Sequence, residues 1–452
     1  MERKLKPRQV QMIALGGTIG VGLFMGATST IKWTGPSVLL AYIIAGAFLY
    51  MIMRALGEML YVDPQTGSFA KYAQEYIHPV WGYLTSWSNI FQYIVVGVSE
   101  MIAVGGYLQY WWPSIPSWLP GLIAITFLGI ANLISVKMFG ELEFWFALIK
   151  VLTIIIFIIL GLGVILFGFG NGGHPVGFSN LWEHGFFTGG VKGFFFALAL
   201  VLTSYQGIEL IGVTAGEAQD PQNTLVKAIK STVYRILIFY VGAIFVILCI
   251  YPWDQLNSVG SPFVQTFAKI GITAAASIIN FVVLTAALSG TNSGIYSASR
   301  MTYNLAEAHE LPSFYTKVNR NGVPAYAVFA ISFGIFIGLV LNALAPLVFK
   351  NAGNAFVIVY SSSTLPGMVP WFVILISETK FRKRHPELLD NHPFKMPWAP
   401  YSNYVTLAFL IITLGFMFFN PETNVSLMVG LVFLIIMAIF YFIKFGKKSP
   451  QS

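Results

Sequence analysis

Apolar residues fill most of the chain, in long runs separated by short segments that contain glycine, proline or charged residues. A helix of about 20 apolar residues crosses the ~30 Å hydrocarbon core of a bilayer. The sequence therefore predicts an all-α polytopic membrane protein. Its twelve predicted transmembrane helices cover residues 12–33, 36–57, 82–111, 119–137, 144–168, 191–214, 233–251, 270–299, 324–344, 352–377, 402–419 and 425–444.

Glycine interrupts the first of these runs. Five of the fourteen residues from Ile13 to Gly26 are glycine, and each costs up to about 1 kcal/mol in a helix interior relative to alanine. Unwound backbone at membrane depth is tolerated only where it is buried in protein or lines a cavity. The interruption therefore predicts a binding site, where free N–H groups hold an anion and free carbonyls hold a cation. The alternative is close helix packing through Gly16, Gly20, Gly22 and Gly26.

The sixth run contains a second interruption, from Thr203 to Glu209, five spans after the first. Paired broken helices in corresponding positions of two halves indicate a transporter site. Five-span halves begin on opposite sides of the membrane, so the repeat would be inverted. We predict one transporter domain, residues 1–444, with discontinuous helices 1 and 6. Its parts are inverted repeats over 12–168 and 191–377, accessory helices over 402–444, and a basic cytoplasmic tail over 445–452.

Positive charge predicts the orientation. Only 10% of residues are charged, and the net charge is +8. With the N-terminus placed inside, 21 of the 26 Lys and Arg residues fall in inside segments and four fall outside. This bias predicts that both termini are cytoplasmic in a multi-pass protein of the cell membrane. The net positive charge is therefore explained by a lipid bilayer as partner, and it does not indicate that the protein binds nucleic acid. The basic N-terminus lacks a cleavage site, so we read the first run as a retained span.

Four polar features lie inside the spans. Glu100 and Glu209 are far from predicted helix ends, and intramembrane carboxylates indicate function by default. A protonated Glu100 bonded to a neighbouring helix is the alternative. Lys150 either extends to the interface or places its ammonium against freed carbonyls, where a cation would bind. The strip Ser289–Gly294 either joins helices or lines the site.

Two polar connections are predicted to be helical. Ser68–Ile77 carries apolar residues at helical spacing on one face. Arg300–Glu310 continues the eighth span and stops before Pro312. The six histidines show no metal-ligand spacing, and no catalytic or phosphate-binding motif appears. One cysteine allows no internal disulfide. The sequence thus predicts no enzyme, no metal and no cofactor.

Several long motifs recur in order along the chain, at residues 13–24, 54–59, 137–150, 207–212, 215–221 and 292–300. Through them the chain resembles the amino acid transporter family of the amino acid–polyamine–organocation superfamily, the bacterial amino acid permeases. The resemblance implies a five-plus-five inverted-repeat fold with two accessory helices. It also implies amino acid uptake by alternating access, usually coupled to protons.

The resemblance also implies roles for individual residues. The N–H groups of Gly20, Val21 and Gly22 would hold the substrate carboxylate, and the carbonyls of Thr18, Thr203 and Gln206 its ammonium. Tyr205 would shape and gate the pocket, and Gly207 of the same second break would belong to the substrate site. Lys150 would occupy the place of a sodium ion, beside Ser289 or Ser293; the sequence does not choose between these two serines. Glu100 and Glu209 are the remaining candidates for proton coupling.

Val21 departs from relatives that carry serine or threonine there, so only backbone is left to hold the carboxylate. The expected substrate is a small or medium neutral amino acid, although Glu209 leaves a cationic substrate open. The alternatives are a sodium-coupled symporter or an exchanger of the same fold. A membrane sensor that binds an amino acid without moving it is the alternative from another class.

Overall fold

The computed structural model describes residues 7–64, 68–214, 220–256, 263–264, 273–348, 355–390 and 392–445. Helices, most of them α-helices, form the secondary structure of this part of the chain, and no strand occurs in it. The predicted tail after Phe445 and residues 215–219 of one family motif lie outside the described residues. The all-α prediction is confirmed.

The apolar runs all fall on helices, and three of the runs are split. The first becomes α1 (Pro7–Thr18), α2 (Val21–Phe24) and α3 (Gly26–Thr34). The sixth becomes α9 (Gly190–Ser204) and α10 (Leu210–Thr214), and the tenth α15 (Ala355–Ser362) and α16 (Thr364–Arg384). The others are α4 (Val38–Val62), α6 (Pro79–Gln109), α7 (Trp118–Ile134), α8 (Val136–Phe167), α11 (Pro221–Ile250), α13 (Thr273–Glu307), α14 (Ala325–Val348), α17 (Tyr401–Phe418) and α18 (Asn424–Phe445).

Nine helical segments among the described residues are long and apolar enough to cross a membrane. The other three predicted spans fall short of that length, because the first and sixth are broken and α7 has only 17 residues. The count of twelve spans and the division into inverted repeats therefore stay predictions.

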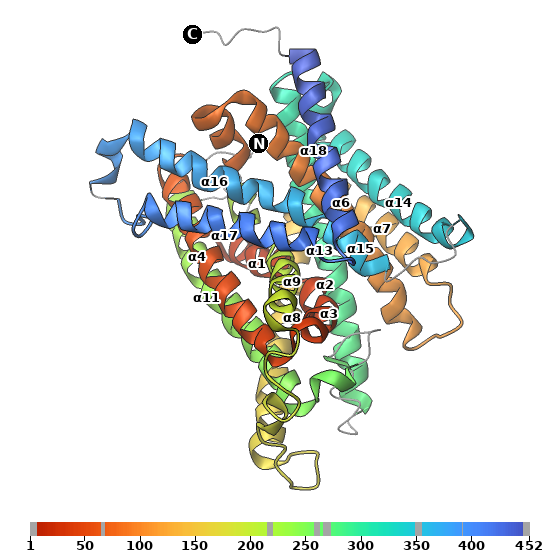
Figure 1. Ribbon diagram of the computed structural model, residues 1–452. Helices are drawn as coiled ribbons and strands as arrows, with labels where there is room; N and C mark the ends of the chain where they lie inside the picture. Colours follow the sequence, from red (N-terminus) through yellow and green to blue (C-terminus); the bar gives the residue numbers. More distant parts are fainter. Residues whose placement is uncertain are drawn as a thin grey trace.

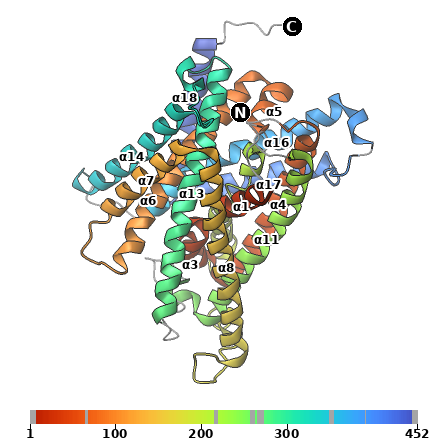
Figure 2. The ribbon, with the colours of Figure 1, turned by 180° about the vertical axis from the view of Figure 1, so that it is seen from behind.

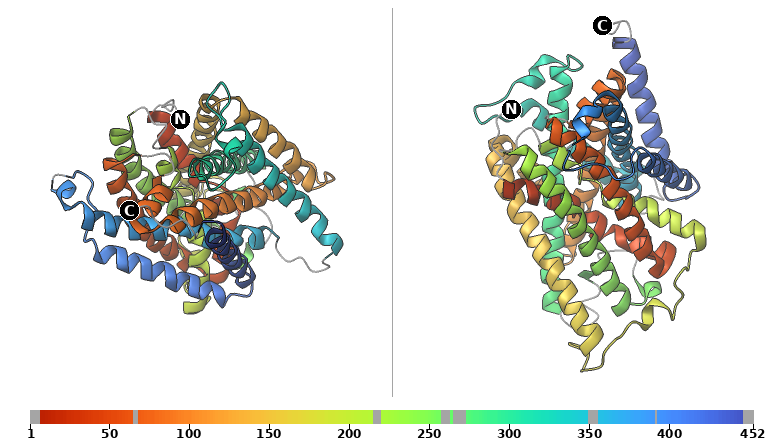
Figure 3. Two further views of the ribbon diagram at one scale, coloured as in Figure 1. Left: turned by 90° about the horizontal axis from the view of Figure 1, so that it is seen from above. Right: turned by 90° about the vertical axis from the view of Figure 1, so that its left-hand side faces the viewer.

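The helices pack as one bundle around α13, whose apolar stretch is 83% buried. It lies along α6, and α1, α8 and α14 contact it as well. The broken helices α1 and α9 run through the middle of the bundle (Figure 1). By contrast, α17 and α18 lie along one side of it (Figure 3) and bury less than a third of their apolar stretches. The breaks are thus enclosed by protein, as unwound backbone in a membrane requires.

The chain begins and ends at the same end of the bundle (Figures 1 and 2). The predicted connecting helix lies at this end, as α5 (Ser68–Tyr72) followed by a turn of π-helix, η2 (Ala73–Ile77). α13 ends at Glu307, close to the predicted stop before Pro312. Both connections are therefore helical as expected.

Candidate substrate site

The first break lies between Thr18, where α1 ends, and Val21, where α2 begins. Gly20 has extended backbone, and its N–H donates to the Thr18 carbonyl over 3.0 Å. The N–H groups of Val21 and Gly22 open a new helix, where the first N–H groups have no carbonyl partner within the helix. The predicted glycine-rich interruption is therefore a true break in the helix.

The second break runs from Tyr205 to Glu209, between α9 and α10. Gly207 has a φ of +105°, which L side chains rarely adopt. A Cβ on Gly207 would lie 2.5 Å from the Gly17 carbonyl oxygen. The Glu209 carboxylate folds back and accepts from the Gly207 N–H at 3.1 Å. The absence of a side chain at Gly207 therefore permits the second break to contact α1. The hydrogen bond from Gly207 to Glu209 holds the turn between α9 and α10 together.

Tyr240 of α11 ties the two breaks together. Its buried hydroxyl lies 2.8 Å from the Thr18 carbonyl oxygen and 3.0 Å from the Ser204 carbonyl oxygen. These carbonyls end α1 and α9, where helix geometry leaves them without an intrahelical donor. The one O–H of Tyr240 can donate to either carbonyl, so this side chain bridges the ends of the two half-helices.

A small pocket of about 30 Å³ lies where the breaks meet, close to the share of liquid volume that one water occupies, ~30 Å³. Six of the predicted substrate residues line it, namely Thr18, Gly20, Val21, Gly22, Thr203 and Gln206. The remaining wall comes from Gly17, Gln92, Tyr93, Val96, Glu100, Ser204, Gly290 and Tyr360. The structure therefore brings these predicted residues together around one small cavity inside the bundle.

Two predicted pocket residues lie behind this wall. Tyr205 is fully buried, donates to the Tyr42 carbonyl over 3.1 Å, and packs its ring on Tyr42 and Tyr240. Gly207 contacts α1 and not the cavity. The residue that faces the pocket beside them is Ser204, which the sequence motifs did not single out.

Glu100 reaches into the pocket from α6. It is 2% exposed and accepts from the Thr291 hydroxyl at 2.8 Å. A Cβ on Gly290 would overlap its carboxyl group, and a Cβ on Gly20 would lie 3.0 Å from it. The two glycines therefore leave room for one carboxyl group beside the first break.

Lys150 lies on the other side of that break, fully buried. Its ammonium donates to the carbonyls of Gly16 and Ile19, the latter over 2.9 Å, and to the Ser289 hydroxyl over 2.9 Å. These three bonds use all three of its N–H donors. The side chain does not extend to the interface, and its hydroxyl partner is Ser289 and not Ser293.

Glu143 is the residue that sequence reasoning missed. It is fully buried, and it accepts from the Ser289 hydroxyl and, over 3.2 Å, from the Asn292 amide. Ser289 thus lies between the carboxyl of Glu143 and the ammonium of Lys150. The spacing of seven residues, which places both on one face of a helix, was the available signal.

The chain is similar to known amino acid permeases. The family model described as amino acid permease matches residues 9–451. A Bacillus subtilis protein named "Probable threonine/serine transporter YbxG" is 62% identical over all of this chain and 97% of its own length. The Bacillus subtilis amino-acid permease AapA is 44% identical over 98% of this chain and 94% of its own length.

The fold is similar to that of a solved transporter. The crystal structure of the Eremococcus coleocola manganese transporter aligns with 97% of this chain, and the alignment covers 94% of that chain with a TM-score of 0.65 at 10% identity. The relatives are transporters and not enzymes, and the predicted superfamily is confirmed. The chain, a multi-pass membrane protein, belongs to the amino acid permease family.

Proposed function

We propose that the chain imports small neutral amino acids with a hydroxyl group, L-threonine and L-serine, together with protons. Amino acid transport follows from its family, and a relative named for threonine and serine is 62% identical. The pocket wall carries polar groups from Thr203, Ser204 and Gln92, which suit a substrate hydroxyl. The excess of basic residues in alternate loops supports cytoplasmic termini in the bacterial cell membrane.

The zwitterion would bind between the two breaks. The N–H groups of Gly20, Val21 and Gly22 would hold its carboxylate, and the carbonyls at the end of α9, with the Glu100 carboxyl group opposite, would hold its ammonium. A helix end contributes roughly 0.3–1 kcal/mol to a charge at an exposed position and up to ~2 when partly buried. The small cavity, about 30 Å³, must widen to admit an amino acid. This fits a site that opens to one side at a time.

The Lys150 ammonium carries the proposal of proton coupling. It fills a cage of two main-chain carbonyls and a hydroxyl at the first break, and such oxygens are typical ligands of a cation at a half-helix end. An ammonium in this cage leaves no need for sodium. Loss and gain of its proton would change the hydrogen bonds that hold the end of α1. Glu143, joined to it through Ser289, and Glu100 would be the other proton-binding groups.

The test is uptake into proteoliposomes, without sodium, for a panel of amino acids with and without an imposed pH gradient. We expect L-threonine and L-serine to compete best and the gradient to drive accumulation. Lys150→Ala should abolish gradient-driven accumulation, while Lys192→Ala, which removes an exposed lysine from α9, should not. Gradient-driven accumulation at the wild-type level in Lys150→Ala would remove the coupling role.

A matched pair of variants tests the cage itself. Ser289→Ala deletes the hydroxyl that Lys150 and Glu143 share, so we expect it to change the pH dependence of uptake. Thr285→Ala, one turn away on α13, removes a hydroxyl that donates to the Val282 carbonyl of its own helix and leaves both hydrogen bonds in place. Equal pH profiles for the two variants would argue against the cage.

A further inference from the structure

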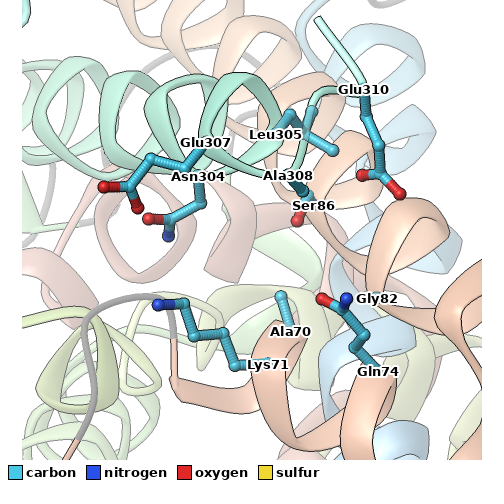
Figure 4. Close-up of a pocket in the computed structure, with 10 residues that line it drawn as sticks. All are labelled: Ala70, Lys71, Gln74, Gly82, Ser86, Asn304, Leu305, Glu307, Ala308 and Glu310. Atoms are coloured by element: carbon cyan, nitrogen blue, oxygen red, sulfur yellow. The ribbon is translucent and has the colours of Figure 1, made fainter. Parts of the chain in front are cut away.

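A second cavity, of about 240 Å³, lies at the end of the bundle where the chain begins and ends. It opens between α5 with η2, the start of α6 and the end of α13 (Figure 4). It shares no lining residue with the pocket at the breaks.

Asn304 of α13 is the feature that indicates a ligand. It is 8% exposed, and among the described residues neither its amide nitrogen nor its amide oxygen has a hydrogen-bond partner. Figure 4 shows this amide group turned into the cavity, toward α5. Buried amides in native structures are nearly always paired. A molecule with both a donor and an acceptor would satisfy both ends of Asn304.

Opposite charges face each other across the same cavity. The ammonium of Lys71 comes from α5, and the carboxylates of Glu307 and Glu310 come from the end of α13 (Figure 4). Within the described part of the chain, none of the three is in an ion pair. Burial raises the pKa of the Glu310 carboxyl to about 7, which a bound cation would reverse. The cavity therefore suits a small molecule that carries one charge of each sign.

We propose that this cavity is a second binding site for a zwitterionic amino acid, from which the internal product slows further uptake. The carboxylate would bind at Lys71, the ammonium at Glu307, which lies beside Asn304 in Figure 4, and Asn304 would bind a remaining polar group. Such a ligand would join α5 to α13, the helix that carries Ser289. Holding these helices together favours the closed pocket. The inference rests on the proposed transport and on cytoplasmic termini.

The first experiment measures the initial influx of labelled L-threonine into proteoliposomes with or without L-threonine in the lumen. Only transporters oriented as in the cell are scored. In the wild type, luminal L-threonine should slow influx about fivefold or more, within the usual range of allosteric coupling. Lys71→Gln and Asn304→Leu should lose this inhibition and keep the influx into empty vesicles. Glu75→Gln, which changes an exposed residue of η2 outside the cavity, should retain it.

The second experiment needs neither transport nor a variant. Detergent-purified protein is treated with an amine-reactive reagent, and the modification of Lys71 is followed by mass spectrometry. L-Threonine should protect Lys71 but not the exposed Lys317. Protection of Lys71 without any uptake would refute the proposed function and leave the site in place. Normal uptake with unprotected Lys71, or inhibition that survives in Asn304→Leu, would overturn the second site.

Discussion

Gly207→Ala is the sharpest test of how the two broken helices fit together. The added Cβ would lie 2.5 Å from the Gly17 carbonyl oxygen, whereas ordinary contact begins at 3.4 Å. Gly17 belongs to α1 and would have to retreat by the shortfall of 0.9 Å. The same change forces an L side chain to a φ of +105°. The second effect acts on the turn between α9 and α10, and the first acts on the last turn of α1.

The consequence can be worked from the contacts of that turn. A retreat of 0.9 Å along the bond would stretch the 2.8 Å contact between the Tyr240 hydroxyl and the Thr18 carbonyl to about 3.7 Å, beyond hydrogen-bond range. Backbone strain of this kind costs roughly 1–3 kcal/mol. If the whole cost raises the barrier of the transport step, uptake slows about fivefold to 160-fold, at ~1.36 kcal/mol per factor of ten.

The assay is the initial rate of L-threonine uptake, normalised to the amount of protein in the membrane. Gly26→Ala is the matched control, because a Cβ there meets nothing within 4 Å. It should transport at the wild-type rate. If Gly207→Ala also transported at that rate, the close approach of the breaks would not matter for function, and the site as described would be refuted.

Two further predictions concern single side chains. Tyr240→Phe removes the hydroxyl between the two breaks, so we expect a lower unfolding temperature and slower uptake. Tyr234→Phe, which changes an exposed tyrosine of the same helix, is the control. An unchanged unfolding temperature in Tyr240→Phe would contradict the bridge. Glu310 has a pKa raised from 4.5 to about 7 by burial, so its ionisation destabilises the folded state. Glu310→Gln should therefore leave the unfolding temperature unchanged near pH 4.5 and raise it by a growing amount between there and pH 7. The same pH dependence in Glu75→Gln would contradict this.

The sequence predicted the two breaks, because clustered glycine and polar residues inside an apolar run disfavour a continuous helix at membrane depth. It also predicted where Lys150 points, once the resemblance was added. It could not choose between Ser289 and Ser293, which lie one turn apart on the same face of α13. That choice depends on how far α13 is shifted along α8, and the periodicity of apolar residues in the sequence does not reveal this shift.

Glu143 was missed for a different reason. The predicted fifth span began at residue 144, so Glu143 was counted as part of a loop. The helix in fact begins at Val136, after Ser135, whose hydroxyl accepts from the Met138 N–H at 3.0 Å. A serine before a helix is a known start signal, yet hydropathy alone does not show it. Hydropathy also did not reveal the split at Ser363 in the tenth run, because the residues on both sides of it are apolar.

One turn of α13 connects the two groups of ionisable side chains. Ser289 bonds to Lys150 and Glu143, Gly290 makes room for Glu100, and Thr291 bonds to Glu100. Any rotation of this turn alters both surroundings at once. Linkage between two binding sites is reciprocal. If a bound proton changes the affinity for the amino acid, the bound amino acid changes the affinity for that proton by the same factor. Three consecutive residues would then couple the movement of protons to the movement of the amino acid.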